Sequence, residues 1–340
     1  MRSIFCLVPP HILYEIIKRT TGPHRDWAIH TLEHSGRLRG HREIITQYEI
    51  PSKNKGKNRI ISSANHTDNI VGSVVRREGD PPTGDASVDQ AYDHAGLTYD
   101  FYSNVFERNS INDNGITIRA LVHYSQNFDN AFWNGEQMTY GDGDGVIFRR
   151  FTKPIDVTGH ELTHGVTQYT ADLTYQDESG AINESMSDIF GSLVKQHNLK
   201  QTVHEADWII GEGIFEPGIQ GVGVRSLKAP GTAYDDPKLG KDPCPAHMDQ
   251  YVKTTQDNGG IHINCTIPSH AFYLASTKVG GHAWEKTGRI WYNVLTKKLG
   301  RNPTFKKLAN LTLKVAKNLY GDNSAEHQAV QYGWHQVGVI

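Results

Sequence analysis

The feature that most constrains this chain is the segment His160-Glu-Leu-Thr-His164, because histidines four residues apart on a helix lie on the same face. Two neutral imidazoles directed at one point suit Zn²⁺, which in a catalytic site takes a third protein ligand and keeps one position open. Glu161 could then accept a proton from a water molecule at the metal. The competing interpretation, two surface histidines around a helical glutamate, is weakened by apolar neighbours that would bury the helix: Ile155, Val157, Leu162 and Val166.

A third ligand is available 20 residues after His164, in a second expected helix. Glu184 could project its carboxylate toward the histidines and complete a His₂Glu site. Asp188, one turn later, could accept the remaining N–H of a ligating imidazole and fix its tautomer. The alternative for Glu184 is a solvated acid on a helix face, but the residues around it are apolar: Ala181, Ile182, Met186 and Ile189.

Charge and hydropathy exclude other classes of protein. The net charge is −2 and charged residues make up 21%, so no overall field points to nucleic acid or to a membrane surface. No apolar run approaches the roughly 20 residues of a membrane-spanning helix. The apolar run near the N-terminus is also shorter than the roughly 7–15 residues of a secretory signal. A cytoplasmic location is therefore the default expectation, with non-classical export as the alternative.

The chain is expected to divide into a small basic segment and a larger remainder. Residues 1–60 carry a net charge of +6 and the rest a net charge of −8. Pro10 suits the first position of a helix whose apolar face would hold Ile12, Leu13, Ile16 and Ile17. A second helix is expected from about Asp26, followed by an exposed basic linker at Ser52–Arg59.

The remainder is strand-rich first and helical afterwards. Strands are expected at 70–76, 117–124 and 138–140, with one helix at 88–108 between them. Helical periodicity then recurs near 155–170, 181–197, 265–278, 283–299, 304–320 and 324–336. This order predicts an α+β protein with two lobes. We expect a small basic helical segment at 1–52, a β-rich lobe at 60–154, and a helical lobe at 155–340 that begins with the helix of His160 and His164.

The block from His160 to Gly191 resembles the thermolysin-like zinc metallopeptidases, the neutral proteinase family. The similarity extends over about residues 70–340 and includes four further segments: 130–138, 140–145, 257–264 and 271–275. The resemblance implies a β-rich N-terminal lobe, a helical C-terminal lobe, and a cleft between them that is floored by the zinc-binding helix.

The resemblance also implies catalytic roles for matching residues. His160, His164 and Glu184 would bind zinc, and Glu161 would act as the general base. His262 and Tyr175 would stabilise the developing oxyanion, and Asp257 would orient the His262 ring. From the residues alone, His262 could be an ordinary loop histidine and Tyr175 a half-buried aromatic.

Substrate contacts follow from the same resemblance. Asn130 and the backbone of Ala131 correspond to an edge strand that holds an extended peptide by β-augmentation. Arg225 would bind the peptide carbonyl after the scissile bond, although alone it would be interpreted as a solvated surface arginine. The apolar residues that correspond to the S1′ pocket favour bulky apolar side chains just after the cut, but could equally be core: Phe148, Phe151, Val157, Ile210, Ile214 and Val224.

Calcium is the second metal that the family suggests. Asp156, Asp207 and Glu212 match positions in its calcium cluster. Lys195, however, stands where relatives have another acid, and an ammonium group opposes a second cation. We therefore expect one calcium ion at most.

The N-terminal segment Pro9-Pro10-His-Ile-Leu13 resembles the short pro-segment of protealysin-type precursors. The resemblance implies a zymogen in which Pro9, Pro10 and Leu13 contact the cleft until processing somewhere within 46–62. Cys6 could alternatively offer a thiolate to the zinc. We therefore expect a zinc endopeptidase that acts on peptides or proteins and is inhibited by its own N-terminal segment, without nucleic-acid or membrane partners. The alternatives are a non-catalytic zinc or peptide-binding protein, and a regulatory protein that uses residues 1–60 to bind a partner.

Overall fold

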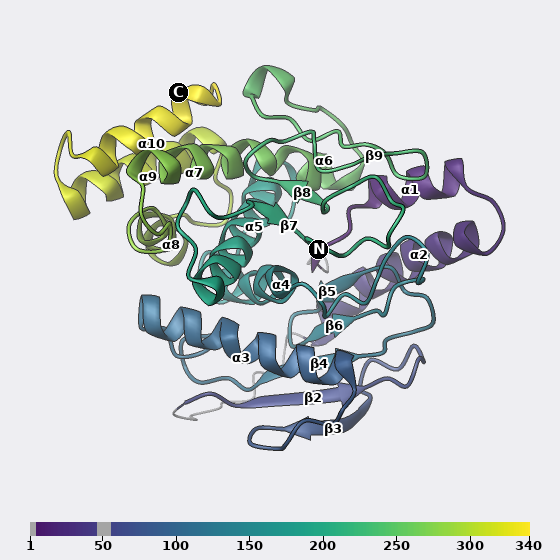
Figure 1. Ribbon diagram of the computed structural model, residues 1–340. Coiled ribbons are helices and arrows are strands. Elements are labelled where there is room, and N and C mark those ends of the chain that lie inside the picture. The colour runs from purple at the N-terminus through teal and green to yellow at the C-terminus, as the bar shows by residue number, and fades with distance from the viewer. Residues whose placement is uncertain (1–4, 46–55) are drawn as a thin grey trace.

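The computed structural model describes residues 5–45 and 56–340, with only the backbone described for 37–45. Its largest sheet has six strands in the order β1-β5-β6-β4-β2-β3 (Figure 1). The strands are β1 (Phe5–Cys6), β2 (Arg59–Ser63), β3 (Ser73–Arg77), β4 (Ile118–Val122), β5 (Ala131–Trp133) and β6 (Met138–Tyr140). Strands β2, β4 and β6 run parallel to one another, and the other pairings are antiparallel. Helix α3 (Ala86–Phe106) packs along this sheet.

The other lobe is helical and is organised around α4 (Ile155–Gln168) and α5 (Asp177–Leu199), which pack against each other along their length. Nearly every residue of these two helices is buried, so they form the centre of the protein. Around them lie α6 (Asp257–Asn264), α7 (Thr266–Val279), α8 (Thr287–Lys297), α9 (Phe305–Tyr320) and α10 (Ala325–Gln336). The smaller elements are β7 (Ile209–Ile210), β8 (Arg225–Ser226), β9 (Asp235–Asp236), β10 (Gly240–Lys241) and a 3₁₀ turn at Met248–Gln250.

The α+β order predicted from the sequence is confirmed, and most predicted elements lie within a few residues of their observed positions. Sequence patterns missed β1 and β2, which are short or lack clear alternation. They also missed α6, which begins with Asp257, Asn258, Gly259 and Gly260. The exposed linker predicted at Ser52–Arg59 is wrong at its end. Arg59 begins β2, is buried, and forms two hydrogen bonds with the Glu78 carboxylate at 2.6 and 2.7 Å.

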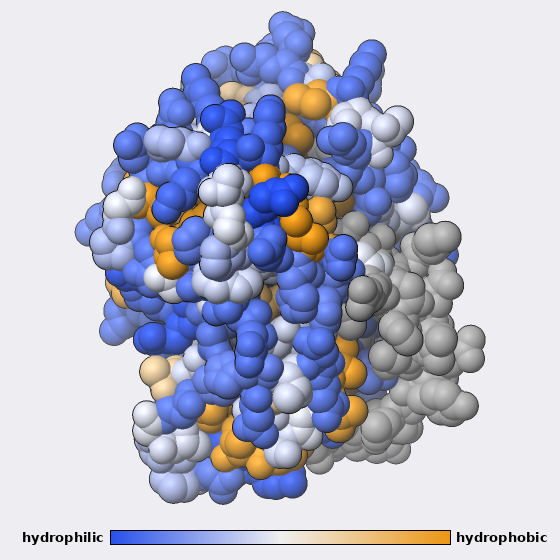
Figure 2. Space-filling model, turned by 90° about the vertical axis from the view of Figure 1, so that its right-hand side faces the viewer, coloured by the Kyte–Doolittle hydropathy of each residue, from blue (hydrophilic) through white to orange (hydrophobic). Residues whose placement is uncertain are grey.

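The N-terminal segment lies against the two lobes. Helices α1 (Pro10–Arg19) and α2 (Pro23–Ile45) pack together on the right-hand side of Figure 1, and α1 also touches β10. Pro10 is the first residue of α1, as predicted, and its apolar face is buried. The face shown in Figure 2, which looks onto this side, is mostly hydrophilic, with apolar residues in small separate patches. None of the helices in the described ranges has the length and apolar character needed to cross a membrane.

Candidate active site

Three buried side chains converge between α4 and α5. His160 and His164 lie one turn apart on α4, with their Nε2 atoms 3.0 Å apart. Glu184 of α5 places its carboxylate oxygens 3.5 Å from His160 Nε2 and 3.3 Å from His164 Nε2. Ligands at about 2.0–2.1 Å from a tetrahedral zinc ion lie about 3.3 Å from one another, so this donor set fits zinc closely. Glu184 Oε2 is buried and has no hydrogen-bond partner, as expected of an oxygen that is reserved for a cation.

Small residues allow the two helices to approach closely enough to bring these ligands together. A Cβ atom on Gly159 of α4 would lie 3.0 Å from the Cα of Gly191 on α5, and one on Gly191 would lie 2.6 Å from the carbonyl oxygen of Asp156. Larger side chains at either position would push α4 and α5 apart. The glycines therefore set the separation at which Glu184 faces the two histidines.

The ring orientations are fixed by hydrogen bonds from the far nitrogens. His160 Nδ1 lies 2.8 Å from Asp188 Oδ1, which is the partner predicted from the sequence. His164 Nδ1 lies 2.8 Å from Asn183 Oδ1 and 3.0 Å from Ser187 Oγ, two partners that sequence reasoning missed. Both arrangements leave Nε2 directed at the common centre, as a metal site requires.

The electrostatics of this cluster favour a bound cation. Burial disfavours the charged form of His160, but the Asp188 and Glu184 carboxylates outweigh it and raise its pKa to about 9. Burial lowers the pKa of His164 to about 3, so this ring is neutral. His160 therefore carries a proton in the absence of metal, and binding of a metal ion would release it.

Glu161, beside the first ligand, is also completely buried. Its Oε2 accepts the backbone N–H of Trp133 at 2.9 Å, whereas Oε1 has no partner. Burial raises the pKa of Glu161 well above its usual range, although His160 opposes the shift. This carboxylate can therefore hold a proton in this environment, which a general base that later acts as an acid must do.

His262, Asp257 and Tyr175 form a second group of side chains beside Glu184. The chain enters α6 through four residues with positive φ, Asp257 to Gly260, and this turn folds the Asp257 side chain back onto the ring of His262. Asp257 Oδ1 lies 2.6 Å from His262 Nδ1, and Asp257 Oδ2 accepts the His262 backbone N–H at 2.9 Å. Tyr175 Oη donates to Glu184 and lies 3.3 Å from His262 Nε2.

Arg225 of β8 is buried rather than a solvated surface residue. Its Nε and Nη2 atoms donate to Asp188 at 2.7 and 2.9 Å, and its Nη1 atom donates to the carbonyl oxygen of Leu7 at 3.2 Å. Asp188 thus contacts both a histidine of the metal cluster and the arginine, a second role that the sequence did not reveal. These hydrogen bonds link the position of the His160 ring to that of the Arg225 guanidinium group.

The four residues from Phe5 to Val8 lie in the site as an extended peptide would. Strand β1 pairs antiparallel with β5, and Leu7 N donates to the carbonyl oxygen of Ala131 at 3.1 Å. Asn130 accepts the N–H of Val8 at 2.9 Å and donates to its carbonyl oxygen at 3.2 Å. His262 Nε2 lies 2.9 Å from the carbonyl oxygen of Cys6.

Among the residues predicted to contact the cleft, Pro9 is the N-cap residue of α1, Pro10 is its first residue, and Leu13 is buried on its inner face. The hydrogen bonds to Asn130, Arg225 and His262 come from the residues before them, Val8, Leu7 and Cys6. Phe5 also contacts the metal cluster, because its ring stacks on the ring of His164 with the centroids 4.4 Å apart. The thiolate alternative has no support, because the Cys6 side chain packs among apolar residues and its carbonyl oxygen is the atom that faces the site.

The six residues predicted to line the S1′ pocket are at most 1% exposed and belong to the main hydrophobic cluster. Leu7, whose side chain is also fully buried, belongs to the same cluster. These residues are thus core in this form of the protein. Leu7 is the residue that follows Cys6, whose carbonyl oxygen lies beside His262.

The predicted calcium cluster is already occupied by an ammonium group. Lys195 Nζ forms ion pairs with Asp207 and, at 2.7 Å, with Glu212. Asp156 is buried, and its Oδ2 accepts the backbone N–H of Gly211 at 3.0 Å. Burial raises the pKa of Asp156 to about 6, although Lys195 opposes the shift. The donor set does not fit calcium, because the lysine supplies the positive charge that the ion would otherwise provide.

A buried His₂Glu cluster, with a glutamate beside its first histidine and an edge strand that holds an extended peptide, defines the site of a metallopeptidase. Comparison with known proteins gives the family. The profile described as "Thermolysin metallopeptidase, catalytic domain" matches residues 33–168, and "Thermolysin metallopeptidase, alpha-helical domain" matches residues 171–339. The chain belongs to the thermolysin family of metallopeptidases.

Individual relatives agree with this assignment. An extracellular metalloprotease of Pectobacterium carotovorum subsp. carotovorum is 47% identical over 344 residues, with 99% of this chain and 97% of that protein covered. A thermolysin of Alicyclobacillus acidocaldarius subsp. acidocaldarius is 44% identical over 262 residues, 75% of this chain and 46% of that protein. The structure of the precursor of protealysin, from Serratia proteamaculans, superposes with a TM-score of 0.91 at 48% identity and covers 99% of this chain and 100% of that one.

These relatives confirm the predicted family, fold class and peptidase activity, and the family implies zinc. They also correct one prediction. A cytoplasmic location was the default because the N-terminal apolar run is short, but relatives from Pectobacterium and from Serratia marcescens are named extracellular metalloproteases. The short apolar run was an unsafe basis for that default, because a secretory signal is one route out of a cell among several.

Proposed function

We propose that this chain is the inhibited precursor of a zinc endopeptidase, in which residues 1–52 block the cleft between catalytic lobes at 60–154 and 155–340. The observation that carries the proposal is the strand Phe5–Cys6, which pairs with β5 and places the Cys6 carbonyl oxygen 2.9 Å from His262. A substrate cannot use these hydrogen-bonding groups while the strand occupies them. The boundary at 52 and the processing region 46–62 fall partly outside the described residues.

His160, His164 and Glu184 would hold the zinc ion in the active enzyme. When bound, zinc supplies a Lewis acid that polarises the scissile carbonyl and lowers the pKa of water. Glu161 accepts the proton of the attacking water and passes it to the leaving amine. Its burial suits this relay, because the raised pKa allows the carboxyl group to hold the proton between the two transfers.

His262 and Tyr175 donate hydrogen bonds to the oxyanion that forms on the carbonyl. His262 already lies at hydrogen-bond distance from a peptide carbonyl, that of Cys6. Burial opposes its protonation, but Asp257 and Glu184 raise the pKa of His262 and favour the form in which both ring nitrogens donate. Asp257 acts as the positioning residue for this ring.

Asn130, the Ala131 backbone and Arg225 position the substrate backbone. Each of these groups now binds a backbone atom of Leu7 or Val8. Leu7 follows the carbonyl group at His262, so its side chain takes the place of the residue after the scissile bond. A buried leucine there supports the preference for bulky apolar residues at this position, with Phe148, Phe151, Val157, Ile210, Ile214 and Val224 as the pocket.

Two further points complete the proposal. We infer that the calcium cluster of Asp156, Asp207 and Glu212 binds no ion in this chain, because Lys195 holds the acids together. The extracellular relatives support action outside the producing cell. The alternatives of a non-catalytic binder or a regulatory protein lack a reason for Glu161, since binding a peptide requires no base.

The test compares the uncut chain with matched variants of its N-terminal segment. Leu7→Asp places a charge on a fully buried side chain and should release the strand, so peptide cleavage by the uncut chain rises. Tyr14→Asp, on the exposed face of α1 where the side chain is 47% exposed, should leave inhibition unchanged. Intact mass and zinc content are recorded alongside activity. Equal cleavage by the uncut wild-type chain and the processed enzyme would overturn the zymogen proposal.

A further inference from the structure

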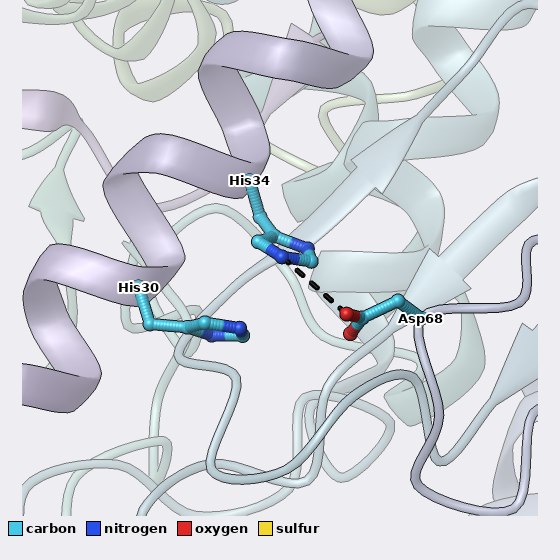
Figure 3. Close-up of side chains that lie close together, drawn as sticks. All are labelled: His30, His34 and Asp68. Atoms are coloured by element: carbon cyan, nitrogen blue, oxygen red, sulfur yellow. Dashed lines mark ion pairs between the residues drawn. The ribbon is translucent and has the colours of Figure 1, made fainter.

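A second group of metal-binding side chains joins the N-terminal segment to the β-rich lobe. His30 and His34 lie one turn apart on α2, and their ring centroids are 4.1 Å apart. Asp68 faces them from the loop between β2 and β3, with Oδ2 3.5 Å from His34 Nε2 (Figure 3). One donor atom from each of the three residues lies within 4.8 Å of the other two.

Both sides of this group are held in place by hydrogen bonds that do not involve its own side chains. On α2, the hydroxyl of Thr31 accepts the backbone N–H of Asp129 at 3.1 Å. In the opposing loop, the carbonyl oxygen of Thr67 accepts the backbone N–H of Ser125 at 2.9 Å, and its hydroxyl donates to Ala64 at 2.7 Å. The histidines and the aspartate therefore face each other across a contact that is already formed.

The donor chemistry selects a class of metal. Two imidazoles and one carboxylate suit borderline transition-metal ions such as Zn²⁺, Ni²⁺ and Cu²⁺, whereas Ca²⁺ and Mg²⁺ require oxygen ligands. The Asp68 side chain is 56% exposed, so water can fill the remaining positions. The 3.5 Å between His34 Nε2 and Asp68 Oδ2 is comparable with the 3.0–3.5 Å donor separations of the catalytic cluster.

We propose that His30, His34 and Asp68 bind one zinc ion that clamps the N-terminal segment to the β-rich lobe. Two ligands belong to the segment and one to the lobe, so the complete site exists only while the segment is docked. By linkage, an ion that binds the docked form alone stabilises it by a factor of about 1 + [Zn²⁺]/Kd, or about 100-fold at 100 times Kd. The role of the ion as a clamp rests on the proposed inhibitory role of the segment, whereas the existence of the metal site does not.

A neighbouring cluster of His66, His123 and Asp142 supplies the internal control. His123 uses both ring nitrogens, with Nδ1 2.8 Å from Asp142 and Nε2 3.0 Å from Asp85. These carboxylates raise the pKa of His123, since their hydrogen bonds and charges outweigh its burial. A metal ion would have to displace hydrogen bonds that already engage both ring nitrogens of His123, so His66→Gln should not alter zinc binding.

The site is tested by equilibrium dialysis of the untagged full-length chain against buffered Zn²⁺, followed by elemental analysis. The wild-type chain should hold two zinc ions, and the processed enzyme, which lacks His30 and His34, should hold one. His30→Gln, His34→Gln and Asp68→Asn should each weaken the second ion by at least about 100-fold, because loss of a group that only supports a ligand costs about 10–100-fold. Circular dichroism checks that each variant remains folded.

The outcomes separate the two parts of the proposal. A single zinc ion in the wild-type chain, two ions in all three ligand variants, or loss of the second ion in His66→Gln would overturn the site. The clamp is tested by the rate at which the segment is released, followed by intact mass at low and saturating Zn²⁺ in the wild-type and His34→Gln chains. The clamp is supported if saturating Zn²⁺ slows release of the segment in the wild-type chain but not in the His34→Gln chain. Equal release rates at low and saturating Zn²⁺ in the wild-type chain overturn it. If no segment is released under any condition, the zymogen proposal fails while the dialysis result stands.

Discussion

Acid should weaken the docking of the N-terminal segment through His11. This residue lies on α1, with Nε2 3.0 Å from the hydroxyl of Tyr234 in the catalytic domain and Nδ1 buried without a partner. Burial lowers the pKa of His11 to about 4; Asp257 opposes the shift, and His262 and Arg225 reinforce it. Glu15 on the same helix also opposes it. The docked segment therefore favours the neutral imidazole.

The size of the effect follows from the two pKa values. A released segment should titrate near 6.5, so it takes up a proton as pH falls below that value, whereas docked His11 resists protonation until about pH 4. Docking is thus unaffected above about pH 7 and is progressively lost between 6.5 and 4. At pH 5 the difference corresponds to about 30-fold, or about 2 kcal/mol, in the docking equilibrium.

The measurement is hydrogen exchange of the backbone amides of residues 5–13, corrected for the intrinsic pH dependence of exchange. A Glu161→Gln background keeps the chain intact. Opening should become about 30-fold more frequent between pH 7.5 and pH 5. His11→Gln should remove most of this dependence, and His24→Gln, which removes another histidine of the segment, should retain it. The same acid response in the His11→Gln chain would refute the reasoning.

Three further predictions concern Glu161, the zinc ligand Glu184, and Lys195 in the predicted calcium cluster. Glu161→Ala should keep zinc but lower peptide cleavage by about 10²–10⁴-fold, and near wild-type turnover in a zinc-replete protein would exclude the role of the base. Glu184→Ala should lose zinc by elemental analysis, whereas Ser185→Ala, one residue further on the same buried helix, should retain it; equal occupancy in the two would refute the ligand assignment. The thermal midpoint of the wild-type chain should not respond to millimolar Ca²⁺, but that of Lys195→Asp should rise with Ca²⁺, because a fourth acid beside Asp207 replaces the ammonium group. An equal response of both proteins would contradict the role given to Lys195.

The long elements of the fold could be predicted because their signals are local. Helices α4, α9 and α10 have an apolar face that repeats every three to four residues, and the sequence placed them within two residues. Strand β1 could not be predicted, because its two residues form a strand only through pairing with β5, more than 120 residues away. Likewise Arg59 lies in a run of basic residues, and its burial depends on Glu78, in the turn just after the neighbouring strand β3.

The metal ligands could be predicted because their signals are also local. The residues that form hydrogen bonds with the ligands could be predicted only in part. His160 and His164 are fixed by helix geometry, and Glu184 by its place on the next buried helix. Asn183, which holds His164, carries no signal that separates it from any other helical asparagine. The second partner of Asp188, Arg225, comes from strand β8, 37 residues away, and required the folded structure.

The segment and the remainder carry net charges of opposite sign, +6 and −8, which would favour electrostatic docking. The described contacts are of a different kind. Within the described part of the segment, Lys18 and Arg19 form ion pairs with Glu15 of the same helix. Besides the pairing of Phe5 and Cys6 with β5, residues 6–8 form five hydrogen bonds with the site, worth about 1 kcal/mol each. Ordering four residues costs about 1–2 kcal/mol each, and burial of the Leu7 and Val8 side chains, both at most 1% exposed, contributes about 1.5–3 kcal/mol each.

The buried face of α1 supplies further affinity for the segment. Ile12, Leu13 and Ile16 are each at most 1% exposed, and burial of such a side chain contributes about 1.5–3 kcal/mol. The strand then blocks the cleft because α1 holds it nearby at an effective concentration of about millimolar, which free substrates rarely reach. It follows that a cut between the segment and the lobes does not by itself open the site. The site opens when α1 is removed from its apolar contacts or is itself digested, and any condition that loosens α1, such as protonation of His11, should act on the cleft through it.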